Sequence, residues 1–213
     1  MDPVLESLHK IGLVPVVKIN DAKDALPLAK ALIDGGLPCA EVTFRTAAGA
    51  ESIRLMRQTY PEMLVGAGTV LTTAQVDEAI AAGAQFIVSP GFNPVVVDYC
   101  LSLGVRMVPG ISDASGVEQC LMRGLEAVKF FPAEQAGGLP YIKALAGPYA
   151  DVLFMPTGGI SPANLVSYLS CPSILCCGGT WMVKEDLIDN GRFDEIERLC
   201  REAVQLMKQV EGR

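Results

Sequence analysis

A lysine lies inside a short apolar run at residues 127–134. The β-branched and aromatic residues around it predict a buried strand that ends at Pro132. Because strand side chains alternate between two faces, Lys129 shares a face with Ala127 and Phe131. Burial among apolar groups favours the free amine, the nucleophile of Schiff-base chemistry. Lys129 is therefore a candidate nucleophile. The structural alternatives are a side chain that reaches solvent and an ion pair with a buried carboxylate.

A glutamate occupies a second apolar run, at residues 39–44. Glu41, Thr43 and Arg45 have the same strand parity, and we expect that face to point into the centre of the fold. Lys129 is the expected neighbour of Glu41, and the two make either an acid–base and nucleophile set or a structural ion pair. Arg45, further out, suits recognition of a carboxylate, or else is a solvated loop arginine.

Two pairs of adjacent glycines follow the last two predicted strands, in residues 156–162 and 177–181. Backbone N–H groups and the positive end of a helix bind anions, and two such strand ends form a phosphate cradle in barrel folds. We expect Gly158 and Gly159 to contribute amides and Thr180 a hydroxyl. Tight turns without a ligand are the alternative. The pattern predicts a phosphate site.

Eight short apolar runs alternate with amphipathic helical stretches, roughly 20 to 26 residues apart. The runs are residues 13–19, 39–44, 64–67, 86–89, 106–108, 127–131, 152–155 and 174–177. Eight strand–helix units predict an α/β fold, a single (β/α)8 TIM barrel that occupies residues 1–213 as one domain. An open doubly wound sheet is the alternative, although it usually has fewer strands and a glycine fingerprint.

The two ends of the chain predict additional helices. Residues 1–12 indicate an extra N-terminal helix at the bottom of the barrel, and residues 189–213 a final amphipathic helix with a packing role. Chemistry in a barrel belongs at the C-terminal ends of the strands. Thr69 and Pro90 follow strands and are expected there.

Composition excludes several classes of function. Half of the 213 residues are apolar and 19% are charged, which is typical of a globular protein. The net charge of −7 argues against nucleic-acid and acidic-membrane partners, which need a basic surface. A small anionic substrate stays compatible with it, because local donors can hold such a ligand.

The histidine and cysteine content argues against a metal site. The one histidine, His9, lies outside every motif above, which disfavours a His-ligated metal or a Ser-His nucleophile. Seven cysteines without a CxxC pair suggest buried thiols in a reducing compartment. No signal peptide or membrane span is recognisable, so we expect a cytoplasmic protein.

Six motifs together resemble the 2-keto-3-deoxy-6-phosphogluconate (KDPG) aldolase family, which also includes 4-hydroxy-2-oxoglutarate aldolases. They are EVTFRT at 41–46, GAGTV at 66–70, SPG at 89–91, VKFFPAE at 128–134, PTGGISPAN at 156–164 and CGGTWMV at 177–183. The resemblance covers nearly the whole chain in order. It implies a class I aldolase of the Entner–Doudoroff pathway that yields pyruvate and D-glyceraldehyde 3-phosphate, without metal or organic cofactor, as a homotrimer.

The same resemblance implies roles for individual residues. Lys129 matches the Schiff-base lysine and Glu41 the proton-shuttling glutamate of the family. Arg45 and Thr69 match the residues that bind the pyruvate carboxylate.

The rest of the implied pocket lies at the later strand ends. Pro90, Phe131 and Thr157 match its walls. Gly158–Gly159 and Thr180 match the phosphate site, where serine is more common at the last position.

Four other functions stay open. Two keep the Schiff base and change the substrate to 4-hydroxy-2-oxoglutarate or 2-dehydro-3-deoxy-6-phosphogalactonate, although Phe131 and Thr157 resemble the gluconate-type pattern. A third is a non-catalytic barrel that senses a sugar phosphate and needs neither Glu41 nor Lys129. The fourth is a phosphate-binding isomerase that uses acid–base chemistry without an imine.

Overall fold

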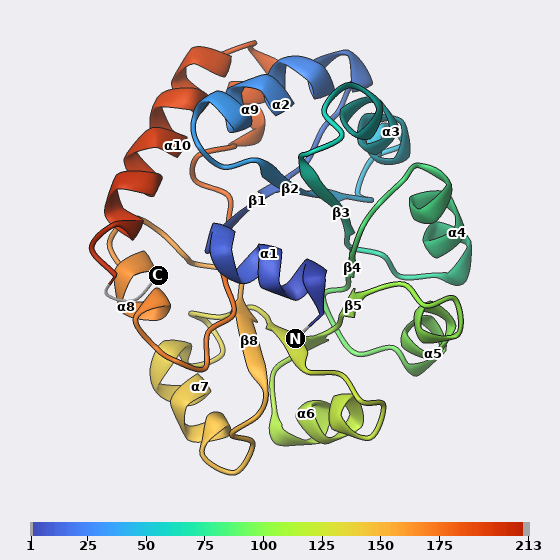
Figure 1. Cartoon of the computed structure of the whole chain (residues 1–213), viewed down its shortest axis with the longest axis vertical. Helices are drawn as coiled ribbons and strands as arrows, with labels where there is room; N and C mark the ends of the chain where they lie inside the picture. The colour runs from blue at the N-terminus through green and yellow to red at the C-terminus, as the bar shows by residue number, and fades with distance from the viewer. Residues whose placement is uncertain (1, 211–213) are drawn as a thin grey trace.

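A ring of parallel strands lies inside a ring of helices in the computed structural model, which describes residues 2–210 (Figure 1). The strands are β1 (Leu13–Val17), β2 (Cys39–Thr43), β3 (Leu64–Gly68), β4 (Ile87–Val88), β5 (Met107–Val108), β6 (Gly110–Ile111), β7 (Ala127–Phe130), β8 (Leu153–Pro156) and β9 (Cys177–Gly179). The helices are α1 (Pro3–Ile11), α2 (Ala25–Asp34), α3 (Gly49–Thr59), α4 (Thr73–Ala81), α5 (Pro94–Ser102), α6 (Ala114–Leu121), α7 (Gly138–Ala146), α8 (Leu165–Leu169), α9 (Glu185–Asp189) and α10 (Phe193–Met207), with a short 3-10 helix at Ala22–Asp24.

Hydrogen bonding carries the sheet around the whole ring. One sheet runs β5-β4-β3-β2-β1-β9 and the other β6-β7-β8. β5 and β6 are one strand interrupted at Pro109, with β5 paired to β4 and β6 to β7. Parallel bridges from Phe154 to Ile174 and from Thr157 to Gly178 join β8 to the β9 segment. The predicted TIM barrel is confirmed.

Two predicted elements differ from the structure. The last strand is Cys177–Gly179 rather than residues 174–177, since Ile174 makes only an isolated bridge. The final predicted helix begins at Phe193 rather than at residue 189 and ends at Met207, because Gly191, with a φ of 65°, separates it from the short helix α9. Residues 1 and 211–213 of the predicted terminal helices lie outside the described residues.

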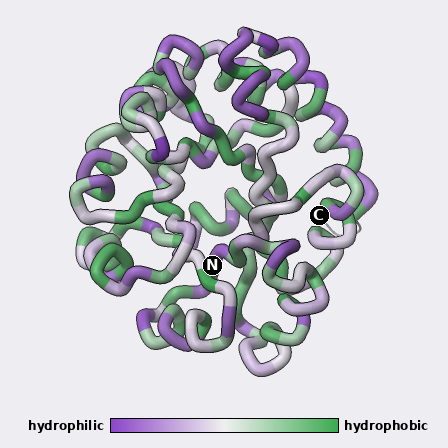
Figure 2. The backbone as a smooth tube through the Cα atoms, turned by 180° about the vertical axis from the view of Figure 1, so that it is seen from behind, coloured by the Kyte–Doolittle hydropathy of each residue, from purple (hydrophilic) through white to green (hydrophobic). Residues whose placement is uncertain are grey.

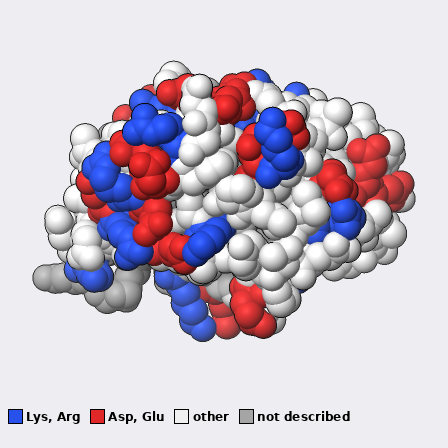
Figure 3. Space-filling view, turned by 90° about the horizontal axis from the view of Figure 1, so that it is seen from above, with Lys and Arg blue, Asp and Glu red and all other residues white. Residues whose placement is uncertain are grey.

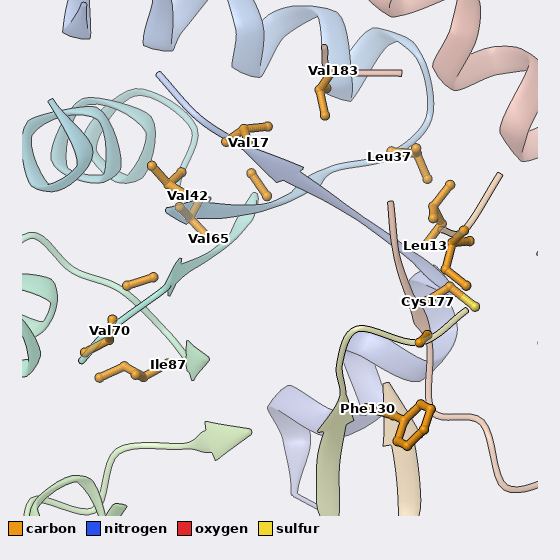
Figure 4. Close-up of a cluster of buried hydrophobic side chains, with 14 of the residues drawn as sticks. Leu13, Val17, Leu37, Val42, Val65, Val70, Ile87, Phe130, Cys177 and Val183 are labelled. Carbon is orange, nitrogen blue, oxygen red and sulfur yellow. The ribbon is translucent and has the colours of Figure 1, made fainter. Parts of the chain in front are cut away.

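Alternating side chains divide the apolar residues into two cores. The outward faces of the strands pack against the helices, with Val17, Val42, Val65 and Phe130 all fully buried (Figure 4). The inward faces form a separate cluster at the bottom of the barrel. Its members are Leu5, Leu8, Val14, Cys39, Leu64, Phe86, Val88, Val108, Ala127, Met155, Leu175 and Cys176. The predicted parity of β2 and β7 is therefore confirmed.

Helix α1 crosses one end of the barrel, as Figure 1 shows. Leu5 and Leu8 of this helix are fully buried against the inward cluster. Asp2 caps the helix by accepting from the N–H of Val4 at 2.8 Å, and Arg106 forms an ion pair with Asp2 at 2.5 Å. The bottom of the barrel is thus filled, which leaves the opposite end for a ligand.

The outer surface is polar and carries charges of both signs. Seen from the other end in Figure 2, hydrophilic stretches lie mainly on the outer helices. Figure 3 shows acidic and basic side chains interleaved, and ion pairs such as Lys30–Asp34 and Arg201–Glu197 connect them. Among residues 2–210, no helix combines the length and the apolar character needed to cross a membrane.

We expect the Asp2–Arg106 ion pair to stabilise the closed end of the barrel. Burial acts to raise the pKa of Asp2, but hydrogen bonds from Arg106 and the Val4 N–H lower it overall. Asp2→Asn keeps the helix cap and loses the charge, so the free energy of unfolding should fall by up to about 1 kcal/mol at pH 7. The difference from wild type should shrink as the pH falls below the ordinary value of 3.8.

Urea denaturation at pH 7 and at acidic pH measures this effect. Glu51→Gln, which breaks the exposed ion pair with Arg54, is the matched control and should cost less. Equal losses for the two variants at pH 7 would contradict a special role for the pair at α1.

Candidate active site

Lys129 and Glu41 meet inside the upper half of the barrel. They come from β7 and β2, which lie on opposite sides of the ring. The Lys129 Nζ donates to Glu41 Oε1 at 3.0 Å, and the side chains belong to residues that are 5% and 0% exposed. Two oppositely charged groups on inward faces of facing strands are thus paired away from solvent.

The Glu41 carboxylate has one oxygen left over. Its Oε2 is buried and has no hydrogen-bond partner among residues 2–210. A buried acceptor without a donor is costly, so this oxygen is available for a proton or a donor of a bound ligand. Gly68 makes room for the carboxylate, because a Cβ there would lie 2.3 Å from Oε1. Gly68 is part of the GAGTV motif at 66–70, and its contact with Glu41 is visible only in the structure.

An aromatic ring borders the lysine. The Lys129 Nζ lies 5.5 Å from the centroid of the Phe131 ring, within cation–π range. Phe131 has the same strand parity as Lys129 and lies one step nearer the mouth. The amine is therefore enclosed by a carboxylate on one side and an apolar ring on another.

A cavity of about 260 Å³ opens above this pair. It brings together all ten residues that the sequence predicted for the site. They are Glu41, Arg45, Thr69, Pro90, Lys129, Phe131, Thr157, Gly158, Gly159 and Thr180. Val16, Thr43, Ile160 and Gly178 also line it and were not predicted as site residues. The inward parity of β1 and β2 was the available signal for Val16 and Thr43.

Arg45 is oriented from below. Its Nε donates to the Thr43 Oγ1 at 3.2 Å, and the Thr43 hydroxyl donates to the Val17 carbonyl at 2.9 Å. Thr43 is buried, so this chain of hydrogen bonds fixes the position of the Arg45 Nε. The guanidinium lies at the wall of the cavity and can present its remaining donors to an anion.

Another wall of the cavity is made of glycine-rich backbone. Gly158 and Gly159 have φ values of 97° and 83°, a region that favours glycine. The N–H groups of Gly159 and Thr180 have no acceptor within residues 2–210. Thr157 Oγ1 is buried and likewise without a partner there, and a Cβ on Gly178 would lie 2.3 Å from it. This rim offers several free donors.

The two glycine pairs do not lead directly into helices. α8 begins at Leu165 and α9 at Glu185, several residues after the glycines. Two turns intervene, in which Ser161 N–H donates to Asn164 Oδ1 and Val183 N–H donates to the Thr180 carbonyl. The donors of this rim are therefore loop amides.

Metal-binding side chains do not gather anywhere in the described chain. Residues 2–210 contain no group of three His, Cys, Asp or Glu side chains that could hold a metal ion. All seven cysteines are buried. His9 lies on α1, with its Nδ1 3.1 Å from the Leu175 carbonyl oxygen, far below the cavity mouth.

A larger hollow of about 500 Å³ lies on the outside of the barrel, along α10. Trp181, Leu199 and Leu206 are among its lining residues. It contains no buried acid–base pair, so the chemistry belongs to the smaller cavity above Lys129.

Comparisons with known proteins agree with this geometry. The family model described as KDPG and KHG aldolase matches residues 4–199. A 2-dehydro-3-deoxy-phosphogluconate aldolase from Treponema pallidum is 49% identical, over 97% of this chain and 99% of its own length.

Two solved structures have the same fold at high sequence identity. KDPG aldolase from Legionella pneumophila, with pyruvate captured as a covalent carbinolamine intermediate, is 38% identical with a TM-score of 0.90, over 94% of this chain and 97% of that one. The Zymomonas mobilis enzyme with 3-phosphoglycerate is 41% identical with a TM-score of 0.87, over 93% and 94% of the two chains. The chain therefore belongs to the KDPG and KHG aldolase family.

Proposed function

We propose that this protein is a class I aldolase that cleaves KDPG to pyruvate and D-glyceraldehyde 3-phosphate. The observation that carries the proposal is the buried contact of Lys129 Nζ with Glu41 Oε1, 3.0 Å apart at the floor of the cavity. Family membership supports it, as does the pyruvate carbinolamine of the Legionella relative.

The reaction begins with imine formation. The proton that Lys129 shares with Glu41 can pass to the carboxylate, which leaves a free amine beside a neutral acid. The Lys129 Nζ then adds to the C2 carbonyl carbon of the substrate to give a carbinolamine. Glu41 returns a proton to the C2 hydroxyl, which departs as water and leaves a protonated imine.

Carbon–carbon cleavage uses the same two residues. Glu41 accepts the proton of the C4 hydroxyl while the C3–C4 bond breaks. The bonding electrons move toward the imine nitrogen of Lys129 and form an enamine, and glyceraldehyde 3-phosphate leaves. Protonation at C3 and hydrolysis of the imine then release pyruvate and restore the amine.

The carboxylate end and the phosphate end of the substrate bind at separate sites in this proposal. Arg45 and Thr69 bind the carboxylate, and Thr69 adopts a φ of 54°, which is unusual for a residue with a side chain and typical of functional sites. Gly158–Gly159 and Thr180 bind the phosphate, and the amides of Gly159 and Thr180 have no acceptor within residues 2–210. Pro90, Phe131 and Thr157 line the cavity between them.

We expect KDPG to be the preferred substrate. The free amides of the rim favour a phosphorylated compound over 4-hydroxy-2-oxoglutarate. The buried Lys129–Glu41 pair favours an enzyme over a sugar-phosphate sensor, which has no use for it. Comparison of kcat/KM for KDPG, its galactonate epimer and 4-hydroxy-2-oxoglutarate tests this order. A higher value for either of the other two would refute the assignment.

We also propose a cytoplasmic homotrimer without metal or organic cofactor, as the family resemblance implies. Sedimentation velocity measures the mass directly, and a monomer at micromolar concentration would contradict the trimer.

Borohydride trapping tests the nucleophile. Incubation with pyruvate and borohydride should add the mass of a reduced pyruvate imine to the peptide that contains Lys129. Lys129→Arg keeps a cation beside Glu41 but forms no imine, so the adduct should disappear and kcat/KM should fall on the order of a thousandfold or more. Lys143→Arg, at an exposed lysine of α7, is the control and should behave as wild type. An adduct on another lysine would exclude Lys129.

A second test moves the acid without changing its chemistry. In Gly68→Ala, the new Cβ would lie 2.3 Å from Glu41 Oε1 and must displace the carboxylate. Misplacement of a catalytic group by about 1 Å costs roughly a hundredfold, so we expect kcat to fall by about that factor. Gly91→Ala places its Cβ in open space and is the matched control. A folded Gly68→Ala protein with the wild-type kcat would show that Glu41 has no catalytic role.

A further inference from the structure

The loop that carries the glycine pair is attached to the segment that follows Lys129. Ala133 N–H donates to the Thr157 carbonyl at 2.8 Å, and Glu134 N–H donates to the Gly158 carbonyl at 3.1 Å. The chain that carries the nucleophile therefore continues directly into contacts with the proposed phosphate seat.

The side chain of Glu134 extends this attachment. A Cβ on Gly159 would lie 2.5 Å from Glu134 Cγ, so the stem of the glutamate packs directly against the glycine pair. Tyr168 of α8 is 1% exposed and donates its hydroxyl to Glu134 Oε1. Burial and this hydrogen bond raise the pKa of Tyr168 well above its ordinary value, so the hydroxyl stays protonated and remains a donor.

The hydrogen bond closes a loop of contacts around the glycine pair. Glu134 packs against the glycine pair from the segment after β7, and Tyr168 lies on α8, the helix that follows the pair in sequence. Asn164 Nδ2 donates to the Gly159 carbonyl at 3.0 Å. Glycines in left-handed conformations have wide conformational freedom, so their amides need such partners to keep one orientation.

We propose that Glu134 and Tyr168 are positioning residues for the phosphate end of the substrate, an inference that rests on the proposed function. Neither residue lines the cavity, so both act through the backbone of Gly158–Gly159. Their hydrogen bond holds the loop amides at a set distance from Lys129, because Glu134 follows Lys129 by only five positions in the chain. Preorganised amides bind an anion without the entropic cost of ordering the loop.

The experiment compares phosphorylated and unphosphorylated substrates in four variants. Tyr168→Phe and Glu134→Ala remove the hydrogen bond, whereas Glu134→Gln keeps an amide oxygen that accepts from Tyr168. Tyr149→Phe is the matched control. Tyr149 donates a similar hydrogen bond to Glu118, with an oxygen–oxygen distance of 2.8 Å, and neither residue lines the cavity.

Tyr168→Phe and Glu134→Ala should raise KM for KDPG by about tenfold, equivalent to about 1.4 kcal/mol. Their values of kcat/KM for 4-hydroxy-2-oxoglutarate and their pyruvate trapping by borohydride should stay within about twofold of wild type, since Lys129 and Glu41 are untouched. Glu134→Gln should restore most of the affinity for KDPG. Tyr149→Phe should match wild type with both substrates.

Three results would overturn the inference. They are an unchanged KM for KDPG in both bond-breaking variants, equal losses with the two substrates, and a Glu134→Gln variant as impaired as Glu134→Ala. The Glu134 variants decide the matter if Tyr168→Phe fails to fold, because Glu134 is exposed. A wild type that forms no imine or does not prefer the phosphorylated substrate refutes the proposed function itself, and this inference with it.

Discussion

Lys129 and Glu41 form an ion pair in a place where neither charge is stable alone. Removal of each ion from water costs several kcal/mol, and only close pairing offsets that cost. The pair spans the barrel from β7 to β2, so it depends on a closed ring that holds these strands opposite each other. Such an arrangement adds little to stability compared with apolar packing. Its value is chemical, because one proton can move between a nucleophile and an acid that share a dry site.

Space for this pair comes from residues that have no side chain. Gly68 leaves the volume that the Glu41 carboxylate fills, and Gly178 does the same for the Thr157 hydroxyl. The barrel interior is accordingly divided along its axis. Its lower part is packed with apolar side chains and closed by α1, whereas its upper part alternates polar side chains with glycines around the cavity. A dry floor beneath a polar mouth is what imine chemistry needs.

Much of the fold followed from periodicity. Eight strand–helix units predicted the barrel, and the parity of β2 and β7 placed Glu41 and Lys129 on the inward faces. Local patterns were less reliable near the last two strands. Ile174 looks like part of a strand but makes a single bridge, and the final helix begins at Phe193, after Gly191, rather than at residue 189. The glycine pairs lead into turns rather than helix ends, because Asn164 caps a turn before α8 begins.

The sequence by itself determined which residue types are present at the strand ends and which face of each strand they occupy, because strand alternation is a local property of the backbone. It also carried the family resemblance, which extends over most of the chain. Only the tertiary structure decided that Lys129 and Glu41, 88 residues apart, come within 3.0 Å. The same is true of the space left by Gly68 and of the contact between Tyr168 and Glu134. These depend on how far the ring curves and how the loops cross its mouth, and no local pattern encodes those distances.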